Sequence, residues 1–306
     1  MTNLLSVILV NFKRPDLTID CVRSLLSSKF TDFEIVIVDN ESTPESNDKL
    51  RASCPRAVVL PSEKNLGFGG ANNLGIRYAL QHGADYILLL NNDTIVRDDT
   101  IEILLRTAKE YPQAGVIGAK IYYYERPNEL WYAGGRLDVN KALGRHIGIG
   151  KIDDGYRMEC VETDFVTGCC LLTKREVIDK IGMLDHSYFL YDEDADYSIR
   201  ARKAGYSVLY QPSASLYHRV SKSAGWDSPV YIYFNLRNKL LFLRKNGNPR
   251  KLIFNLHYFL YFYSRQFIRL LFKHRNYRAA RAAFLGLRDG LMNYTGDIGE
   301  GSLHKL

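Results

Sequence analysis

The sequence predicts an α/β protein with a mostly parallel central sheet that helices cover on both faces. Over the first 120 residues, short apolar segments alternate regularly with longer amphipathic ones. The apolar segments are rich in Val, Ile and Leu at nearly every position, which is typical of strands buried on both faces. Strands of this kind, joined by helices, form parallel sheets, because a helical crossover lets each strand start from the same edge.

Four strands and four helices are expected in this half of the chain. The strands cover 6–10, 33–39, 56–61 and 86–90, and the helices cover 16–27, 45–53, 70–82 and 98–110. Pro15-Asp16 and Asp98-Asp99 mark the starts of the first and last helices, and Gly83 ends the third. Farther along, 163–185 predicts a strand followed by a helix, and "YSIRARKAGY" predicts another helix.

Composition excludes several classes of protein. The 306 residues are 46% hydrophobic and 25% charged, as in ordinary globular domains. We expect no leader peptide, because no basic segment precedes the first apolar strand, and no apolar run approaches the roughly 18 residues of a spanning helix. The five cysteines show no CxxC spacing. This argues against a disulfide framework or zinc site and favours a cytoplasmic location.

Positive charge is concentrated at the end of the chain. Residues 1–230 hold 27 basic and 31 acidic residues, a net −4, whereas 231–306 hold 14 and 3, a net +11. Such a tail indicates an anionic partner. Segment 251–284 places Arg265, Arg269 and Lys273 at i+4 spacing among aromatic residues, which favours a membrane interface over nucleic acid. Packing on the catalytic domain or on a second subunit is the open alternative.

Polar clusters follow each of the four expected strands. They read "VNFKRPD", "VDNES", "EKNLGFGGANN" and "NNDT". Because parallel strands bring such clusters to one sheet edge, together they favour a nucleotide site. The glycine spacing matches neither GxGxxG nor a P-loop. Asp93, in the last cluster, is either part of a plain turn or a ligand for metal or phosphate.

A second group of carboxylates lies at Asp192, Glu193, Asp194 and Asp196. The helix dipole explains two carboxylates in a first turn. Four repel one another and should raise the pKa of at least one, which points to a cation or a proton-transfer role. His218 follows a later apolar segment; a lone histidine is more often structural, but it becomes a candidate ligand if it faces Asp93.

These motifs together resemble the family-2 inverting glycosyltransferases with the GT-A fold, and in particular bacterial rhamnosyltransferase-like members that build cell-surface polysaccharides. The resemblance rests on "VDN", "NLGFGGAN", "LLLNNDT", "FLYDEDADYSIR" and "YH", in order, over about residues 5–245. It implies a Rossmann-like GT-A domain with a nucleotide-sugar half over 1–120 and an acceptor and catalytic half over 121–230. Residues 231–306 would form a helical, basic, membrane-associating extension.

The resemblance also implies roles for individual residues. Asp194 would be the catalytic base, with Glu193 and Asp196 beside it. Asp93 would hold Mg²⁺ or Mn²⁺ with help from His218, more heavily than usual because Asn91 stands where the family often has an aspartate. The acceptor site would include Asp164 and Gly168. The nucleotide-sugar site would comprise Asn11, Asp39, Asn65, Gly67, Gly70, Asn73, Asn91 and Asn92.

The expected activity is metal-dependent, inverting transfer of a sugar from a nucleoside diphosphate to a glycan or lipid-linked glycan. The rhamnosyltransferase likeness favours dTDP-rhamnose as donor. A UDP-hexose or UDP-N-acetylhexosamine transferase and an inactive carbohydrate-binding relative are the alternatives. A sugar-phosphate nucleotidyltransferase is disfavoured, because "NFKRPD" lacks its glycine-rich, lysine-containing loop. We expect a peripheral protein on the inner face of the cell membrane, with no nucleic-acid partner; the oligomeric state stays open.

Overall fold

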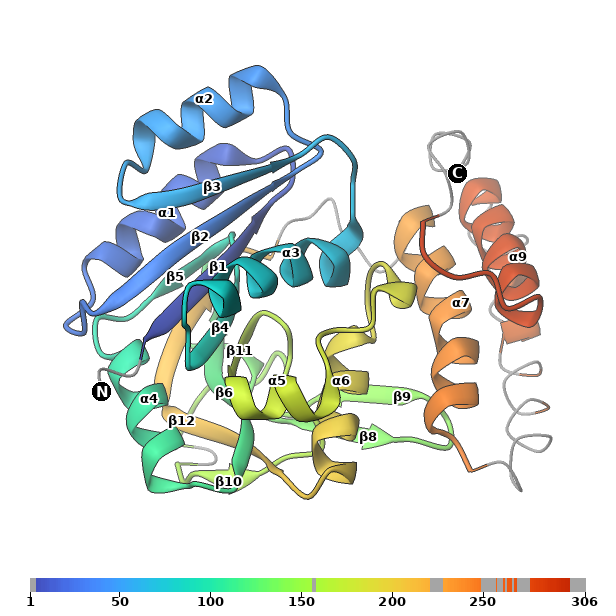
Figure 1. The fold of residues 1–306 in the computed structure, drawn as a ribbon. Coiled ribbons are helices and arrows are strands. Elements are labelled where there is room, and N and C mark those ends of the chain that lie inside the picture. Colours follow the sequence, from blue (N-terminus) through green and yellow to red (C-terminus); the bar gives the residue numbers. More distant parts are fainter. Residues whose placement is uncertain are drawn as a thin grey trace.

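The computed structural model describes residues 4–155, 158–220, 228–248, 257, 261, 263–265, 267–268 and 276–297. In these ranges the chain forms one large mixed sheet with helices on both faces, and two further helices stand side by side at one end (Figure 1). The strand order is β10-β12-β6-β11-β4-β1-β2-β3. The predicted α/β class with a largely parallel central sheet is confirmed.

The first half supplies the parallel part of the sheet. Its strands are β1 (Leu5–Asn11), β2 (Phe33–Asn40), β3 (Ala57–Ser62) and β4 (Tyr86–Asn91). The helices are α1 (Pro15–Leu26), α2 (Pro44–Ser53), α3 (Gly67–Gln81) and α4 (Thr100–Glu110). All eight predicted elements are confirmed. The largest difference is at α3, which begins at Gly67, three residues before the predicted start.

The second half extends the sheet with strands of both directions. It contains β5 (Thr94–Val96), β6 (Ala114–Tyr123), β7 (Leu130–Tyr132), β8 (Gly135–Asp138), β9 (Leu143–His146), β10 (Val161–Glu162), β11 (Cys170–Lys174), α5 (Arg175–Ile181), η1 (His186–Tyr188), α6 (Glu193–Lys203) and β12 (Ser207–His218). The strand and helix predicted within 163–185 are thus confirmed. β11 runs antiparallel between β4 and β6. The end of β12 pairs with β5, so His218 lies opposite Thr94, next to the turn that carries Asp93.

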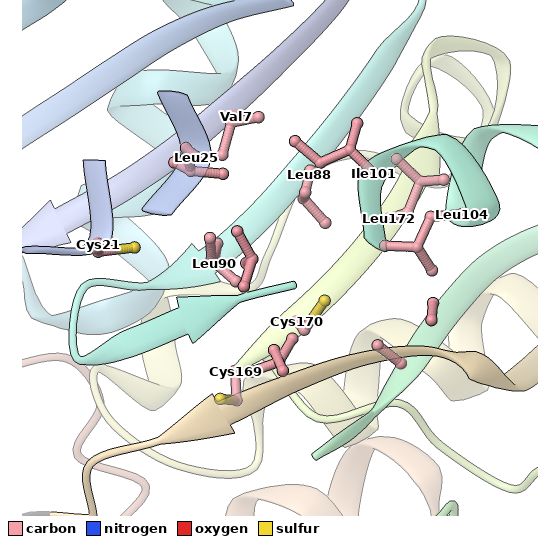
Figure 2. Close-up of a cluster of buried hydrophobic side chains, with 14 of the residues drawn as sticks. Val7, Cys21, Leu25, Leu88, Leu90, Ile101, Leu104, Cys169, Cys170 and Leu172 are labelled. Atoms are coloured by element: carbon pink, nitrogen blue, oxygen red, sulfur yellow. The ribbon is translucent and has the colours of Figure 1, made fainter. Parts of the chain in front are cut away.

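Two apolar clusters cover the two faces of the sheet. Alternate side chains of β1 point to opposite faces: Val7 and Leu9 pack with α1 and α4, whereas Ile8 packs with α3 and α5. Figure 2 shows part of the first cluster, where Cys169 and Cys170 are buried among the leucines. Cysteines buried in this way behave as small apolar side chains. Burial raises the pKa of the Cys170 thiol to about 12.

A third cluster joins the C-terminal helices to the catalytic half. Helices α7 (Pro229–Asn246) and α9 (Tyr277–Leu291) pack closely, and Gly286 allows this because a Cβ there would lie 2.5 Å from the Tyr233 carbonyl oxygen. Their buried residues contact Ala195 and Ile199 of α6. The predicted helical extension is therefore present and packed. Most of segment 251–276 lies outside the described residues, and the division of the chain at 120 and 230 stays a prediction.

None of the helices in the described ranges is both long and apolar enough to cross a bilayer.

Close packing of α3 on the sheet predicts a strong effect of one methyl group. A Cβ at Gly75 would lie 2.6 Å from Ile8 Cγ2 and 3.3 Å from Val38 Cγ2. Gly75→Ala should therefore lower the free energy of unfolding by about 1–3 kcal/mol in urea titrations, despite the better helix propensity of alanine. Gly69→Ala is the matched control, because its nearest neighbour is at 3.5 Å. Equal stability of the two variants would contradict this packing.

Candidate active site

A network of hydrogen bonds fixes the ends of β1 and β2. The Asp39 carboxylate, 1% exposed, accepts hydrogen bonds from Asn11 Nδ2 at 2.6 Å, Ser42 Oγ at 2.5 Å and Ser46 Oγ at 3.0 Å. Thr18 Oγ1 of α1 donates to Asn11 Oδ1 at 2.8 Å. The two predicted nucleotide-binding residues Asn11 and Asp39 therefore form one rigid polar group at the sheet edge.

The network continues to the ends of β3 and β4. Asn92 Nδ2 donates to Thr18 Oγ1 at 2.8 Å, which ties the loop after β4 to α1. On the other side, Asn40 Nδ2 donates to Asn65 Oδ1 at 3.0 Å, and the same oxygen accepts from the Gly67 amide at 2.9 Å. All four predicted polar clusters thus meet along one edge of the sheet.

The glycine-rich entry to α3 also has a packing role. Gly67 has φ +69, and a Cβ there would lie 2.3 Å from the Phe189 carbonyl oxygen. Asn73 is buried, with its amide group bonded to the backbone N–H and C=O of Leu184 at 3.0 and 2.7 Å. A Cβ at Gly70 would meet Leu66 Cβ at 3.1 Å. The contacts of Gly67 and Asn73 join α3 to the segment between α5 and α6, whereas Gly70 packs on the start of its own helix. Donor binding by Gly67, Gly70 and Asn73 stays a prediction.

Asp93 and His218 face each other. Nε2 of His218 lies 3.0 Å from Oδ1 of Asp93, and both side chains are largely buried. The contact is not aligned as a hydrogen bond: among the described residues, neither Asp93 Oδ1 nor His218 Nδ1 has a hydrogen-bond partner. The ring of Trp131 packs edge-on against His218, with centroids 4.5 Å apart, and holds its orientation. From the sequence, His218 is a candidate ligand if it faces Asp93, and the structure places the two side chains face to face.

The donor atoms of this pair suit a divalent cation. Two ligands at about 2.1 Å from an octahedral ion, at right angles to each other, are about 3.0 Å apart. That is the observed separation of Nε2 and Oδ1. No cluster of three or more His, Cys, Asp or Glu suited to a metal occurs within the described ranges. Two protein ligands leave most of the coordination sphere for a diphosphate and water, as is usual for Mg²⁺ beside phosphates.

Asp194 opens α6 with its carboxylate held by two backbone amides. Oδ2 accepts from the Gly168 N–H at 2.8 Å and Oδ1 from the Ala195 N–H at 2.7 Å. Burial raises the pKa of this carboxyl to about 6, and the two amide hydrogen bonds limit the rise. A carboxylate with that pKa is charged at neutral pH but binds a proton far better than a free aspartate does, which suits a general base.

The dipeptide Gly168-Cys169 links the two groups. The Gly168 N–H binds Asp194, and the Cys169 carbonyl oxygen accepts from the Asn91 N–H at 2.9 Å, two residues before Asp93. Burial first, and then the charges of Asp93 and Asp194, raise the pKa of the Cys169 thiol well above its usual value. The Asp93–His218 pair, which suits a metal ion, and the Asp194 carboxylate, which suits a general base, therefore lie on either side of this two-residue connection.

The carboxylates around Asp194 have different surroundings. Asp196 is paired with Arg200 at 2.8 Å and accepts from Tyr188 Oη and Asn246 Nδ2, so its charge is already compensated within the fold. Glu193 is 4% exposed, and its Oε2 has no partner among the described residues. Burial and the neighbouring Asp194 raise the pKa of Glu193 well above its usual value. A catalytic part for Glu193 and Asp196 stays a prediction.

The two predicted acceptor residues also have different surroundings. Asp164 accepts from the Leu137 N–H at 2.9 Å and pairs with Arg202 at 3.4 Å, which ties β8 to α6. Gly168 contacts the candidate base directly, and a Cβ there would lie 2.9 Å from the Phe68 ring. Gly168 thus belongs to the centre of the site. Acceptor binding by either residue stays a prediction.

Sequence reasoning missed the residues that hold the turn before α6. Phe189, Tyr191 and Asp192 all have positive φ. Asn238 Nδ2 lies 2.7–3.0 Å from the carbonyl oxygens of residues 188, 190 and 191, and Arg237 donates to the first of these at 2.6 Å. Both α7 side chains are fully buried. The signal was present in "LRNKLL", a polar triplet inside an otherwise apolar helix.

Several proteins of known function are similar to this chain over most of its length. The chain is 26% identical over 263 residues to an N-acetylglucosaminyl-diphospho-decaprenol L-rhamnosyltransferase of Mycobacterium tuberculosis, covering 79% of this chain and 85% of the relative. It is 27% identical to the low-salt glycan biosynthesis hexosyltransferase Agl10 of Haloferax volcanii, covering 95% and 92%.

Solved structures share the fold. A mannosyltransferase from Pyrobaculum calidifontis in complex with GDP-Man and Mn²⁺ superposes with a TM-score of 0.59 at 11% identity, covering 94% of this chain and 87% of that one. The family model described as glycosyl transferase family 2 matches residues 6–182, more than half of the chain. The chain belongs to glycosyl transferase family 2, an inverting family with the GT-A fold, and is a nucleotide-sugar glycosyltransferase.

Proposed function

We propose that this enzyme moves a deoxyhexose, with inversion, from a nucleoside diphosphate to a lipid-linked glycan, using a divalent cation. The observation that carries the proposal is the placement of the Asp93–His218 pair and Asp194 on either side of Gly168-Cys169. Direct displacement at an anomeric carbon needs these two functions at opposite ends of the reacting bond: one stabilises the leaving diphosphate, and the other accepts a proton from the nucleophile.

Asp93 and His218 would hold Mg²⁺ or Mn²⁺, which, when bound, neutralises the charge that develops on the departing diphosphate. The buried Oδ1 of Asp93, which has no hydrogen-bond partner among the described residues, supports this role, because leaving it without a partner costs the fold free energy. Asp194 would accept the proton of the acceptor hydroxyl at its carboxylate as the hydroxyl attacks. The edge formed by Asn11, Asp39 and Asn65 would take the nucleoside.

The choice of rhamnose rests on likeness, and dTDP is the favoured nucleotide. The mycobacterial relative is named for L-rhamnosyl transfer to a lipid diphosphate acceptor, whereas the archaeal relative is named only as a hexosyltransferase. A UDP-hexose or UDP-N-acetylhexosamine donor is the competing assignment. A lipid-linked acceptor would bring the protein to a membrane surface, and the net +11 of residues 231–306 fits an anionic one.

The cation site predicts donor binding that depends on metal. Calorimetric titration with dTDP, UDP, GDP and CDP should show Mn²⁺-dependent binding of one nucleotide. Asp93→Ala should weaken it at least about tenfold, because even residues behind a ligand typically cost 10–100-fold. Asp98→Ala removes a carboxylate that pairs with Lys29 and serves as the control. Unchanged metal-dependent binding in Asp93→Ala would remove Asp93 from the cation site.

The base assignment predicts a pH dependence. Transfer should fall about tenfold per unit as the pH drops below about 6, because protonation of Asp194 removes the base. Asp194→Asn should abolish transfer while donor binding stays within about twofold of wild type.

The same variant should be the more stable one at high pH. The pKa of Asp194 is higher in the folded than in the unfolded protein, so its negative charge lowers the stability of the folded protein. This loss of stability is complete above pH 6 and disappears as the pH falls below the pKa of the unfolded state. The melting temperature of Asp194→Asn should exceed that of wild type at pH 8 and approach it near pH 4. Normal transfer by this variant would show that Asp194 is not the base.

The α7 contacts predict a catalytic effect without a binding defect. Asn238→Leu keeps the number and branching of the side-chain heavy atoms but removes the donor to three carbonyl oxygens of the turn that leads to Asp194. A displacement of about 1 Å can cost on the order of 10²-fold, so kcat should fall by that factor while donor affinity is retained. Asn235→Leu is the control on the same helix, because within the described ranges the Asn235 side chain bonds the Tyr231 hydroxyl and not the turn before α6. An equal kcat in both variants would refute the role of Asn238.

A further inference from the structure

The outward side of α9 carries apolar and basic residues in regular alternation. Tyr277, Arg281, Phe284, Arg288 and Leu291 are exposed and follow one another at spacings of four, three, four and three, so they form one stripe. Arg278 is exposed beside them. Tyr277 is 68% and Phe284 58% exposed, although the opposite side of α9 already packs on α7. These six residues are called the α9 face below.

An apolar groove opens next to the α9 face. Its volume is about 460 Å³, within the usual range for ligand pockets. Phe284 belongs to both the groove and the face. The other lining residues come from α7, from α9 and from the segment before it: Leu236, Tyr261, Tyr263, Ser264, Phe267, Ala283 and Leu287. A groove of this composition fits a hydrocarbon chain.

Charge on the α9 face has one sign. The single acid of α9 is Asp289, which is buried, accepts from the Tyr233 hydroxyl at 2.8 Å and pairs with Arg288 at 2.6 Å. Arg278 and Arg281 make no ion pair with any residue of the described ranges. Arg278 and Arg281 therefore carry positive charge that no carboxylate of the described ranges compensates, beside the aromatic side chains of the face.

We propose that the α9 face rests on an anionic bilayer and that the groove takes one hydrocarbon chain of a bilayer lipid. The arginines would lie at the lipid phosphates, while Tyr277, Phe284 and Leu291 would enter the interfacial zone, where aromatic rings are favoured. The inference rests on the proposed function in one respect: a lipid-linked acceptor gives the enzyme a reason to work at that surface.

Charge and shape disfavour the other occupants. A second copy related by a two-fold axis would place the same patch against itself, so arginines would face arginines with no carboxylate on the α9 face to separate them. Nucleic acid would satisfy the arginines but has no aliphatic chain for the groove. An anionic lipid surface satisfies both features at once.

The test is sedimentation of the full-length protein with vesicles of about three parts phosphatidylglycerol to seven parts phosphatidylcholine. The wild type should bind these vesicles and should bind pure phosphatidylcholine vesicles much more weakly. Arg278→Gln with Arg281→Gln should reduce the partition coefficient about thirtyfold, since each near-surface arginine contributes about fivefold. Phe284→Ser should reduce it about tenfold through lost apolar contact.

Matched controls lie on α4. Arg106→Gln with Lys109→Gln removes the same charge from another exposed helix, and Tyr111→Ser removes another exposed aromatic ring. Both should bind like wild type. Equal losses in the α4 and α9 variants would show a non-specific charge effect and overturn the proposal. Dimerisation of the wild type that the α9 substitutions abolish, without vesicle binding, would assign the face to a second copy.

A reporter at the groove tests the hydrocarbon chain. Ser264→Trp places an indole at the groove, and lipids brominated on their acyl chains should quench its emission beyond the quenching seen in wild type. If Ser264→Trp shows no additional quenching, no lipid chain occupies the groove, and the proposal for the groove is refuted. Vesicle binding needs neither donor nor acceptor. Metal-dependent nucleotide binding without vesicle binding would therefore refute this inference while the proposed function stands.

Discussion

The active site depends on one short connection, the dipeptide Gly168-Cys169. Its amide holds the Asp194 carboxylate and its carbonyl holds the strand that ends before Asp93. Backbone groups have no rotamers to lose, so the spacing between the proposed base and the proposed cation ligands is set by the sheet itself. Side chain size matters at Gly168 too, because a methyl group would strike the Phe68 ring. The glycine therefore lets the start of β11, α3 and α6 meet closely.

The turn before α6 stores strain that α7 offsets. Phe189, Tyr191 and Asp192 have positive φ, each costing on the order of 1–3 kcal/mol. The carbonyl groups of this turn point into the protein, where Asn238 and Arg237 satisfy them. An unsatisfied buried carbonyl would add a further cost of similar size. Helix α7 thus makes the strained turn before the proposed base the lowest-energy conformation.

Patterns within short segments of sequence were enough to predict the parallel half of the sheet and the sheet edge at which the polar clusters lie. The strand at 33–39 is continuously apolar from Ile35 to Val38 and helices such as 98–110 are amphipathic, so period and turn chemistry locate them. They also place Asp93 at a strand end. They could not show that Asp39 accepts from Asn11 or that Asn73 clamps Leu184, because those contacts join residues 28 and 111 positions apart in the chain. The role of Asn238 is missing for the same reason: its partners lie 47 to 50 residues away.

The two C-terminal helices serve the enzyme through opposite surfaces. The inner side of α7 holds the catalytic turn, and α9 keeps α7 in place: Tyr233 of α7 binds the buried Asp289, and Arg237 also reaches the Gly296 carbonyl. The outer side of α9 does not pack on α7 and carries the aromatic and basic residues of the α9 face. Removing the chain after residue 245 would expose α7 and disturb the catalytic turn as well as any surface contact. Point substitutions on α9 separate the two roles, because they change the outer surface and leave the packing against α7 intact.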